Sequence, residues 1–193
     1  LLSHSVAGPK YKLPLRLLMQ LFFLARHVLT SNVIVCRFAG YHTVLPVLFG
    51  KLFRRPVIII LGGTECHRFP AIGYGAQLKK LYRSVVNFSL RNASMLAPVH
   101  ESLISCEYDY DASGKPRQGC KEFCKGLTTP FKAVYNGYDN NRFHDLKLVR
   151  KKNSFVTVAL SYGDPEFLVK GADLILEAAG MLPDHSPERR RQG

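Results

Sequence analysis

Hydrophobic and polar positions divide the chain into short continuous apolar runs and longer segments with helical spacing. The short runs show little polar alternation, which is typical of strands in a parallel sheet covered on both faces. The longer segments repeat apolar residues every three or four positions, which predicts amphipathic helices. Strands are predicted at 32–37, 57–61, 95–99, 132–135 and 154–160, and helices at 14–29, 43–53, 78–91 and 169–181.

The first two predicted strands and the helix between them form a βαβ unit, which implies a parallel sheet with a right-handed crossover. The expected fold class is therefore α/β, with a Rossmann-like parallel sheet and flanking helices. Parallel strands end at one edge, where α/β proteins bind ligands. Three turns are expected there, at Phe38–His42, Gly62–Glu65 and His100–Ser102. Two adjacent glycines let a ligand approach the main chain, so Gly62–Glu65 is predicted to floor a binding cleft.

The chain is expected to form one domain and the beginning of another. Residues 1–145 are assigned to the first Rossmann-like domain, and residues 146–153 to a polar, basic linker. A fresh apolar run then opens residues 154–193, where one strand and one helix would begin a second Rossmann-like domain. The chain starts at a leucine and stops after an arginine run, so both ends are expected to be truncated. The last helix is expected to bury Leu174, Ile175, Ala178 and Met181.

The first helix, over 14–29, has a strongly apolar stripe, and packing in the core is its expected role. The alternative is a helix that lies on a membrane surface, which Arg16, Arg26 and His27 would suit. Its most apolar run, Leu17–Ala25, covers about half of the ~20 residues that a membrane-spanning helix needs. The stripe consists of Leu17, Leu18, Leu21, Phe22, Leu24, Ala25, Val28 and Leu29.

Positive charge is concentrated in the first half of the chain. Residues 1–100 contain thirteen Lys or Arg and one acid, Glu65, whereas residues 101–193 contain fourteen bases and thirteen acids. Such a basic half favours an anionic partner, which means phosphate groups, an acidic membrane or nucleic acid. A solvated basic face is the alternative interpretation. The sequence has no zinc finger, RNA-recognition signature or basic recognition helix, so nucleic acid is not the expected partner.

The cysteines indicate neither a disulfide framework nor a metal site. There are five of them at irregular spacing, which favours reduced thiols and a cytoplasmic location. Cys120 and Cys124 lie four residues apart. Zinc sites use paired Cys-x-x-Cys or a histidine at matching spacing, so no metal site is predicted.

An ordered set of short motifs between residues 30 and 182 resembles family 4 glycosyltransferases of the GT-B architecture. The motifs are FAGYH, VIIILGGTE, HESL, VYNGYD, FVTVAL and LVKGADLILEAA, in that order. In this family two Rossmann-like domains face each other across a cleft, the first binding the acceptor and the second the nucleotide-sugar donor. The resemblance implies that this chain holds the first domain and the beginning of the second. It also implies a retaining, metal-independent reaction without a cofactor.

The diglycine turn matches the family's active-site turn. The resemblance implies that Gly63, Thr64 and Glu65 face the reacting sugar and form the catalytic turn. Gly62 stands where members often have a histidine, and Glu65 stands where they often have an aspartate. A structural salt bridge is the alternative role for Glu65.

Other matched residues are assigned to the two substrates. Lys170 and Gly171 match the pair that binds the donor diphosphate, where a cation at a helix start stabilises the leaving group. A surface lysine is the alternative role. An arginine that members often carry upstream is replaced by Ser161–Gly163. His42 and His100 each follow a strand, where a base can act, although packing is the alternative role. The cleft residues on the acceptor side are His42, Gly62, Glu101, Ser102 and Asn136.

The expected function is transfer of a sugar from a nucleotide-sugar donor to a glycan or lipid-linked acceptor, in bacterial surface polysaccharide or glycolipid synthesis. The basic first half would hold a phosphate-bearing acceptor at the inner face of the cytoplasmic membrane, in peripheral contact with anionic lipid. One alternative is a non-catalytic fragment that binds anions or carbohydrate, because the family's donor-ribose carboxylates are not in this sequence. Nucleic-acid binding is a third hypothesis that rests on net charge alone.

Overall fold

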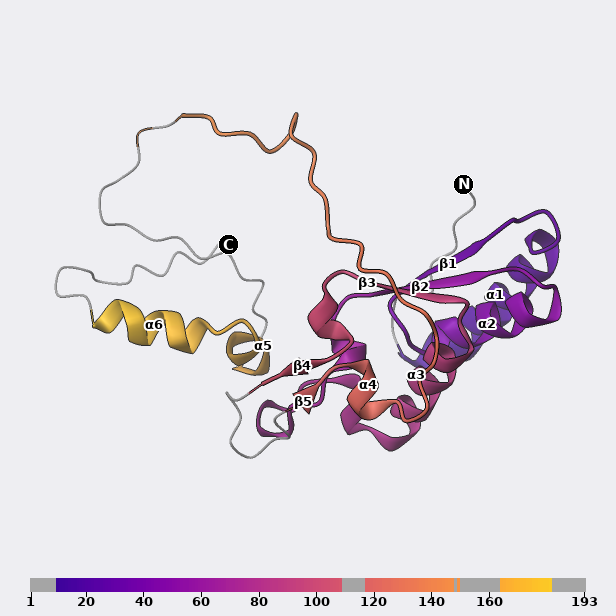
Figure 1. Cartoon of the computed structure of the whole chain (residues 1–193), viewed down its shortest axis with the longest axis horizontal. Helices are drawn as coiled ribbons and strands as arrows, with labels where there is room; N and C mark the ends of the chain where they lie inside the picture. The colour runs from indigo at the N-terminus through magenta and orange to yellow at the C-terminus, as the bar shows by residue number, and fades with distance from the viewer. Residues whose placement is uncertain (1–9, 109–116, 148, 150–163, 182–193) are drawn as a thin grey trace. The chain divides into compact units, whose positions relative to one another are not determined.

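The chain divides into two compact units, residues 1–136 and residues 137–193. The boundary between them comes earlier in the chain than residue 145, where the first domain was expected to end. The residues that the computed structural model describes are 10–108, 117–147, 149 and 164–181 (Figure 1).

Unit 1 is built on a parallel sheet with the strand order β1-β2-β3. The strands are β1 Ile34–Arg37, β2 Val57–Leu61 and β3 Met95–Pro98. A further segment runs beside β3, because the Leu96 N–H donates to the Pro130 carbonyl oxygen and the Val134 N–H donates to the Pro98 carbonyl oxygen, both at 2.9 Å. The segment predicted as a strand at 132–135 runs beside β3 but does not form a regular strand, and only an isolated parallel bridge links Phe131 to Leu96. The predicted α/β class with a parallel sheet is confirmed.

Helices α2 and α3 pack side by side, and α1 packs against α2. The helices are α1 Leu13–His27, α2 Tyr41–Leu52 and α3 Lys80–Asn92, with a short 3-10 helix, η1, at Lys10–Lys12. The Thr43 hydroxyl donates to Ser89 Oγ at 2.8 Å and joins α2 to α3. Gln20 Nε2 donates to the His42 carbonyl oxygen at 2.8 Å and joins α1 to α2. Leu81 of α3 is exposed.

Among the described residues, the sheet buries one face and leaves the other partly open. Ile59 and Leu61 of β2 are buried, whereas Ile58 and Ile60 are only partly buried and Val35 of β1 is 56% exposed. The expectation of a sheet covered on both faces is therefore wrong for this part of the chain. The strands follow one another in sequence order, and two right-handed crossovers in the same direction place α2 and α3 on the same face.

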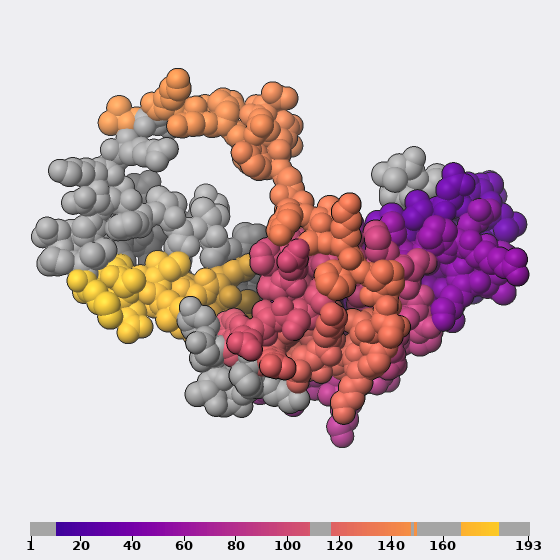
Figure 2. Space-filling model, viewed as in Figure 1, coloured from indigo at the N-terminus to yellow at the C-terminus, as the bar shows by residue number. Residues whose placement is uncertain are grey.

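Helix α1, which belongs to the indigo end of the chain in Figure 2, has most of its apolar stripe exposed. Of the eight stripe residues, only Leu24 and Val28 are buried, whereas Phe22 is 67% exposed and Leu18 is 48% exposed. The inward side of α1 includes the buried Gln20. The expected core role is thus wrong for most of the stripe, because α2 is the main partner of α1 and covers one side only. None of the helices in the described residues is long and apolar enough to cross a bilayer.

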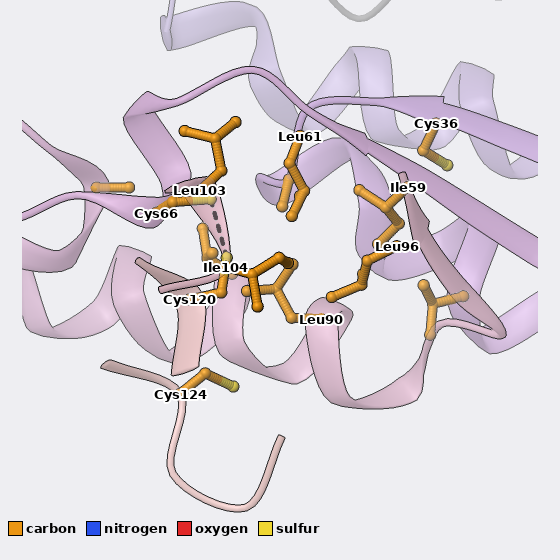
Figure 3. Close-up of a cluster of buried hydrophobic side chains, with 14 of the residues drawn as sticks. Cys36, Ile59, Leu61, Cys66, Leu90, Leu96, Leu103, Ile104, Cys120 and Cys124 are labelled. Atoms are coloured by element: carbon orange, nitrogen blue, oxygen red, sulfur yellow. Dashed lines mark hydrogen bonds between the residues drawn. The ribbon is translucent and has the colours of Figure 1, made fainter. Parts of the chain in front are cut away.

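Residues that the sequence pattern left without an element form a small second sheet and a short helix. They are β4 Cys106–Glu107, β5 Arg117–Gln118 and α4 Cys120–Phe123, and the 3-10 helices are η2 Thr64–Cys66, η3 Pro70–Ile72, η4 Ala76–Leu78 and η5 Glu101–Leu103. The buried Gln118 side chain accepts from the Arg68 N–H at 3.0 Å and donates to the Arg68 carbonyl oxygen at 3.2 Å. Cys120 Sγ lies 2.8 Å from Cys66 Sγ inside the core (Figure 3). This small sheet therefore holds the loop that follows β2.

The helices in the described part of unit 2 are α5 Asp164–Val169 and α6 Ala172–Gly180. The predicted buried stripe of α6 is exposed, with Leu174 at 53% and Met181 at 73%. That expectation is wrong for the described residues, because within them α6 has only the short helix α5 as its main packing partner. The predictions that lie outside the described residues are the strand at 154–160, the segment Ser161–Gly163 and most of the linker at 146–153.

Candidate functional site at the carboxyl ends of the strands

The carboxyl ends of the three strands meet at one rim of unit 1, as their parallel pairing requires. Just after β1, the Phe38 N–H donates to the Ile60 carbonyl oxygen of β2 at 2.8 Å. Just after β3, the Val99 N–H donates to the Leu61 carbonyl oxygen of β2 at 3.0 Å. His100 then meets the ring of Tyr135 edge-on, with 5.8 Å between ring centroids. The polar turns predicted after these strands therefore share a rim. At its centre lies Gly62–Glu65, which we call the corner.

Gly62 is fixed by its contact with an aromatic ring. A Cβ atom added at Gly62 would lie 2.1 Å from a ring carbon of Phe38, which is far inside van der Waals contact. Phe38 itself has a φ of 63°, a conformation that few residues other than glycine adopt. The Phe38 ring therefore occupies the space that a side chain at Gly62 would need, and this position contributes only backbone to the rim.

Glu65 is the most enclosed polar residue of the corner, at 3% exposure. Its Oε1 accepts from the Gly62 N–H at 2.8 Å. Burial raises the pKa of this carboxyl group, against backbone hydrogen bonds from Gly62, Gly63 and Ala39 that lower it. Because Ala39 follows β1, the carboxyl group ties the corner to the end of the neighbouring strand. Within the described residues, backbone hydrogen bonds rather than a salt bridge hold this carboxyl group, and the catalytic role of Glu65 stays a prediction.

The loop after the corner folds back and adds two side chains that the sequence analysis did not select, His67 and Tyr74. The Tyr74 hydroxyl lies 3.0 Å from Thr64 Oγ1. A Cβ atom added at Gly63 would be 4.0 Å from both His67 Nδ1 and the Tyr74 hydroxyl, so these groups flank the space over Gly63. The loop is closed by two backbone hydrogen bonds between Phe69 and Tyr74, at 2.8 and 3.0 Å. The sequence feature that could have identified His67 is its position, two residues after the corner.

His67 carries an imidazole suited to proton transfer. Burial lowers its pKa from the ordinary value of 6.5, and a hydrogen bond with the Gly63 backbone opposes this shift. The ring is therefore neutral near pH 7 and can accept or donate a proton. It also stacks on Phe69, with 5.4 Å between ring centroids, which fixes the plane of the imidazole.

The other predicted rim residues surround the corner. His42 lies in the first turn of α2, and its Nε2 is 3.0 Å from the Arg37 carbonyl oxygen. His100 accepts from the Ser102 N–H at 3.2 Å and caps η5 through its side chain. Glu101 and Asn136 are exposed. The two histidines that the sequence analysis weighed are therefore held by backbone groups.

The predicted donor-binding residues belong to unit 2. Lys170 is exposed in the turn between α5 and α6. Gly171, which caps α6, takes a φ of 63°, in the left-handed region that glycine adopts without strain. The two residues therefore lie next to the start of a helix, as the motif predicts.

The thiols behind the corner are buried and weakly acidic. Cys66, the last residue of η2, is fully buried against Cys120, and the contact between the two thiols together with burial raises the pKa of Cys66. Cys124 is also buried, and its pKa is raised to about 11. All five cysteines are free thiols. In the part of the chain that the structure describes, no group of three His, Cys, Asp or Glu side chains could hold a metal ion.

The rim combines a neutral imidazole, the hydroxyl groups of Thr64 and Tyr74, and the exposed main chain of Gly62. Such groups can hydrogen-bond to the hydroxyls of a sugar and can move a proton. Comparison of the chain with protein-family models and with curated protein sequences found no match. The functional inference therefore rests on the geometry of the rim and on the motifs around it.

Proposed function

We propose that the protein is a glycosyltransferase with GT-B architecture that moves a sugar from a nucleotide-sugar donor to a glycan or lipid-linked acceptor. The observation that carries this proposal is the shared rim of parallel strands with a diglycine corner at its centre. Open α/β sheets bind their ligands at this edge. The order of the motifs along the chain, which resembles that of family 4 glycosyltransferases, supports the choice of substrate.

In this proposal the reacting sugar lies over Gly63, between the side chains of His67 and Tyr74. The neutral imidazole of His67 exchanges a proton with the acceptor hydroxyl, and the hydroxyls of Thr64 and Tyr74 orient the sugar. His67 thus takes the role of the histidine that family members often carry at the position of Gly62. The 4.0 Å distances from a Cβ atom at Gly63 to His67 and Tyr74 support this assignment.

The donor diphosphate is assigned to Lys170 and Gly171 of unit 2. A cation next to the amino end of α6 would neutralise the charge that develops on the leaving diphosphate. The proposed reaction is retaining and needs neither a metal ion nor a cofactor, as the family resemblance implies. Support for this step comes from the exposure of Lys170 directly before the helix.

The acceptor side is proposed to work at the inner face of a bacterial cytoplasmic membrane, in surface polysaccharide or glycolipid synthesis. The outward face of α1 supports peripheral binding, because Leu15, Met19 and Phe22 are exposed on it at 54–67%. Residues 1–64 contain eight Lys or Arg and no acid, so anionic lipid would be attracted rather than repelled.

A non-catalytic module that binds carbohydrate or anions is the second candidate. One observation favours it, namely the burial of Glu65, which leaves the corner without an exposed carboxylate. A binding module needs hydrogen-bonding groups and shape at the rim, and it does not need a catalytic acid or base.

A transfer assay tests the proposed function. The purified chain would be incubated with labelled nucleotide sugars and a bacterial lipid extract, and labelled product in the organic phase would be counted. We expect transfer, and we expect His67→Ala to lower its rate roughly a hundredfold, as loss of a general acid or base does. His144→Ala, which alters an exposed histidine of unit 2, is the matched control and should leave the rate unchanged.

Two outcomes would contradict this proposal. Equal rates for the His67→Ala and His144→Ala variants would remove His67 from the reaction. No transfer from any nucleotide sugar, together with measurable binding of a glycan to the wild-type chain, would leave the binding module as the function.

A further inference from the structure

A basic cavity lies at the opposite edge of the sheet, where β2 and β3 begin. Its volume is about 330 Å³, within the range of small-molecule sites. It is separated from the corner by the full length of β2, so it is not part of the rim. The cavity is lined by Gly50, Lys51, Arg54, Arg55, Pro56, Val57, Asn92 and Ser94.

Three cations line this cavity and no acid does. Lys51 Nζ donates to Asn92 Oδ1, and the Arg55 guanidinium donates to the Leu29 carbonyl oxygen at 2.7 Å. Arg55 Nε is buried and has no hydrogen-bond partner among the described residues. None of the three cations forms an ion pair within the described part of the chain, so their charge is available to a bound anion.

The end of helix α2 fixes two of these cations in place. The Arg54 N–H donates to the Lys51 carbonyl oxygen at 3.4 Å, and the Arg55 N–H donates to the Gly50 carbonyl oxygen at 2.8 Å. These two bonds form a Schellman motif, whose left-handed position is usually glycine. Here Arg54 occupies that position with a φ of 53°. Glycine would close the helix with less strain, which indicates that the arginine side chain serves another purpose.

Neutral donors complete the lining. Ser94 Oγ accepts from the Val57 N–H at 3.0 Å, so its own hydroxyl hydrogen is left to donate. The amide nitrogen of Asn92 donates to the Phe88 carbonyl oxygen at 2.7 Å, which holds this side chain at the cavity wall. The carboxyl end of α2 contributes about half a negative charge, which three cations outweigh.

We propose that this cavity binds a phosphate group. Phosphate has a charge and a set of acceptor oxygens that match two guanidinium groups, an ammonium group and a hydroxyl. The group can belong to a free phosphate ester or to the headgroup of an anionic lipid. Leu52, beside Lys51, is 73% exposed and would contact the acyl chains if the phosphate group belonged to a lipid. The site lies away from the corner, so the proposal stands independently of sugar transfer.

Calorimetric titration with inorganic pyrophosphate at low salt tests the site. The double variant Lys51→Gln/Arg54→Gln should lose about tenfold or more in affinity, because two charge-assisted contacts are removed. The matched control is Lys79→Gln/Lys80→Gln, which removes the same charge from exposed positions at the other end of α3. The control should lose less than about twofold. Equal losses in both variants, or no binding by the wild-type chain, would overturn the proposal.

A single substitution separates binding from folding. Arg54→Gly should raise the midpoint of urea unfolding, because glycine suits a φ of 53°, and should still weaken pyrophosphate binding severalfold. An Arg54→Gly variant that binds pyrophosphate as tightly as the wild type would contradict the assignment of Arg54 to the site.

The source of the phosphate group is resolved by two further titrations, with glycerol 3-phosphate and with phosphatidylcholine vesicles containing phosphatidic acid. Tighter binding of glycerol 3-phosphate assigns the site to a free phosphate ester. Tighter binding of the vesicles, lost in the Lys51→Gln/Arg54→Gln variant, assigns it to a lipid headgroup. Vesicle binding that this variant retains, with no binding of glycerol 3-phosphate, would refute the site.

Discussion

Alanine at Gly75 would test whether closure of the loop after the corner holds His67 in place. Gly75 has a φ of 112°, and a Cβ atom there would lie 2.0 Å from the His67 carbonyl oxygen. The atom it meets is backbone, so the overlap is relieved only if the loop moves. Gly73, in the same loop, has a φ of 63°, and a Cβ atom there would meet nothing within 4 Å. Gly73→Ala therefore introduces only the strain of a positive φ, whereas Gly75→Ala adds an overlap with backbone atoms.

The difference between the two variants follows from these contacts. Placing an L residue in the left-handed region costs about 1–2 kcal/mol, which is the expected loss for Gly73→Ala. Overpacking against atoms that cannot give way adds about 1–3 kcal/mol. We therefore expect Gly75→Ala to lower the free energy of unfolding by about 2–5 kcal/mol, more than Gly73→Ala by at least about 1 kcal/mol.

Urea unfolding followed by far-ultraviolet circular dichroism measures this difference, because the chain contains no tryptophan to report by fluorescence. Hydrogen exchange at the Phe69 and Tyr74 amides would report whether the loop itself opens, since these two amides close it. Equal unfolding midpoints for Gly73→Ala and Gly75→Ala, with equal protection of both amides, would contradict the predicted overlap at Gly75.

Three other predictions concern charge and exposure. Because the pKa of Glu65 is raised in the folded chain, its protonated carboxyl group contributes to stability fully below pH 4.5. This contribution is lost as the pH rises through the raised pKa. The free energy of unfolding of the wild type should therefore fall between pH 4.5 and the raised pKa of Glu65, and this fall should be absent in the Glu65→Gln variant. Urea titrations at a series of pH values measure it, and the same pH profile for both proteins would contradict the assignment. Iodoacetamide should modify the half-buried Cys106 before the four buried thiols, as peptide mass spectrometry would show; uniform labelling would argue otherwise. Phe22→Ser should weaken binding to anionic vesicles about tenfold or more, whereas Leu81→Ser, which alters an exposed leucine of α3, should not. Wild-type binding should be lost at high salt, and equal binding to neutral vesicles would argue against membrane binding by the outward face of α1.

Much of the site could be read from sequence because it follows from strand order. Apolar runs mark the strands, and short helical crossovers make them parallel. Once the strands are parallel, the turns after them must share an edge. That is why the corner, His42 and His100 could be placed on one rim without coordinates, although the roles of these residues could not be assigned.

Other features of the rim depended on contacts between distant residues. His67 and Tyr74 reach the corner because the loop closes and because Gln118, far along the chain, forms two hydrogen bonds with the backbone of Arg68. The burial of Glu65 likewise depends on the end of β1, where the Ala39 backbone meets its carboxyl group. Neither contact leaves a periodic signal in the sequence.

Local periodicity and chain connectivity were enough to predict strands β1 to β3, helices α1 to α3 and α6, and the parallel order of those strands. Which faces are buried depended on contacts between these elements. Helix α1 is apolar over most of its stripe, and yet Phe22 and Leu18 point outward, because burial depends on which neighbours cover a helix. The cations at the end of α2 were also plain in the sequence, but the cavity between them exists only because Asn92 and Ser94, which flank the end of α3, fold against them.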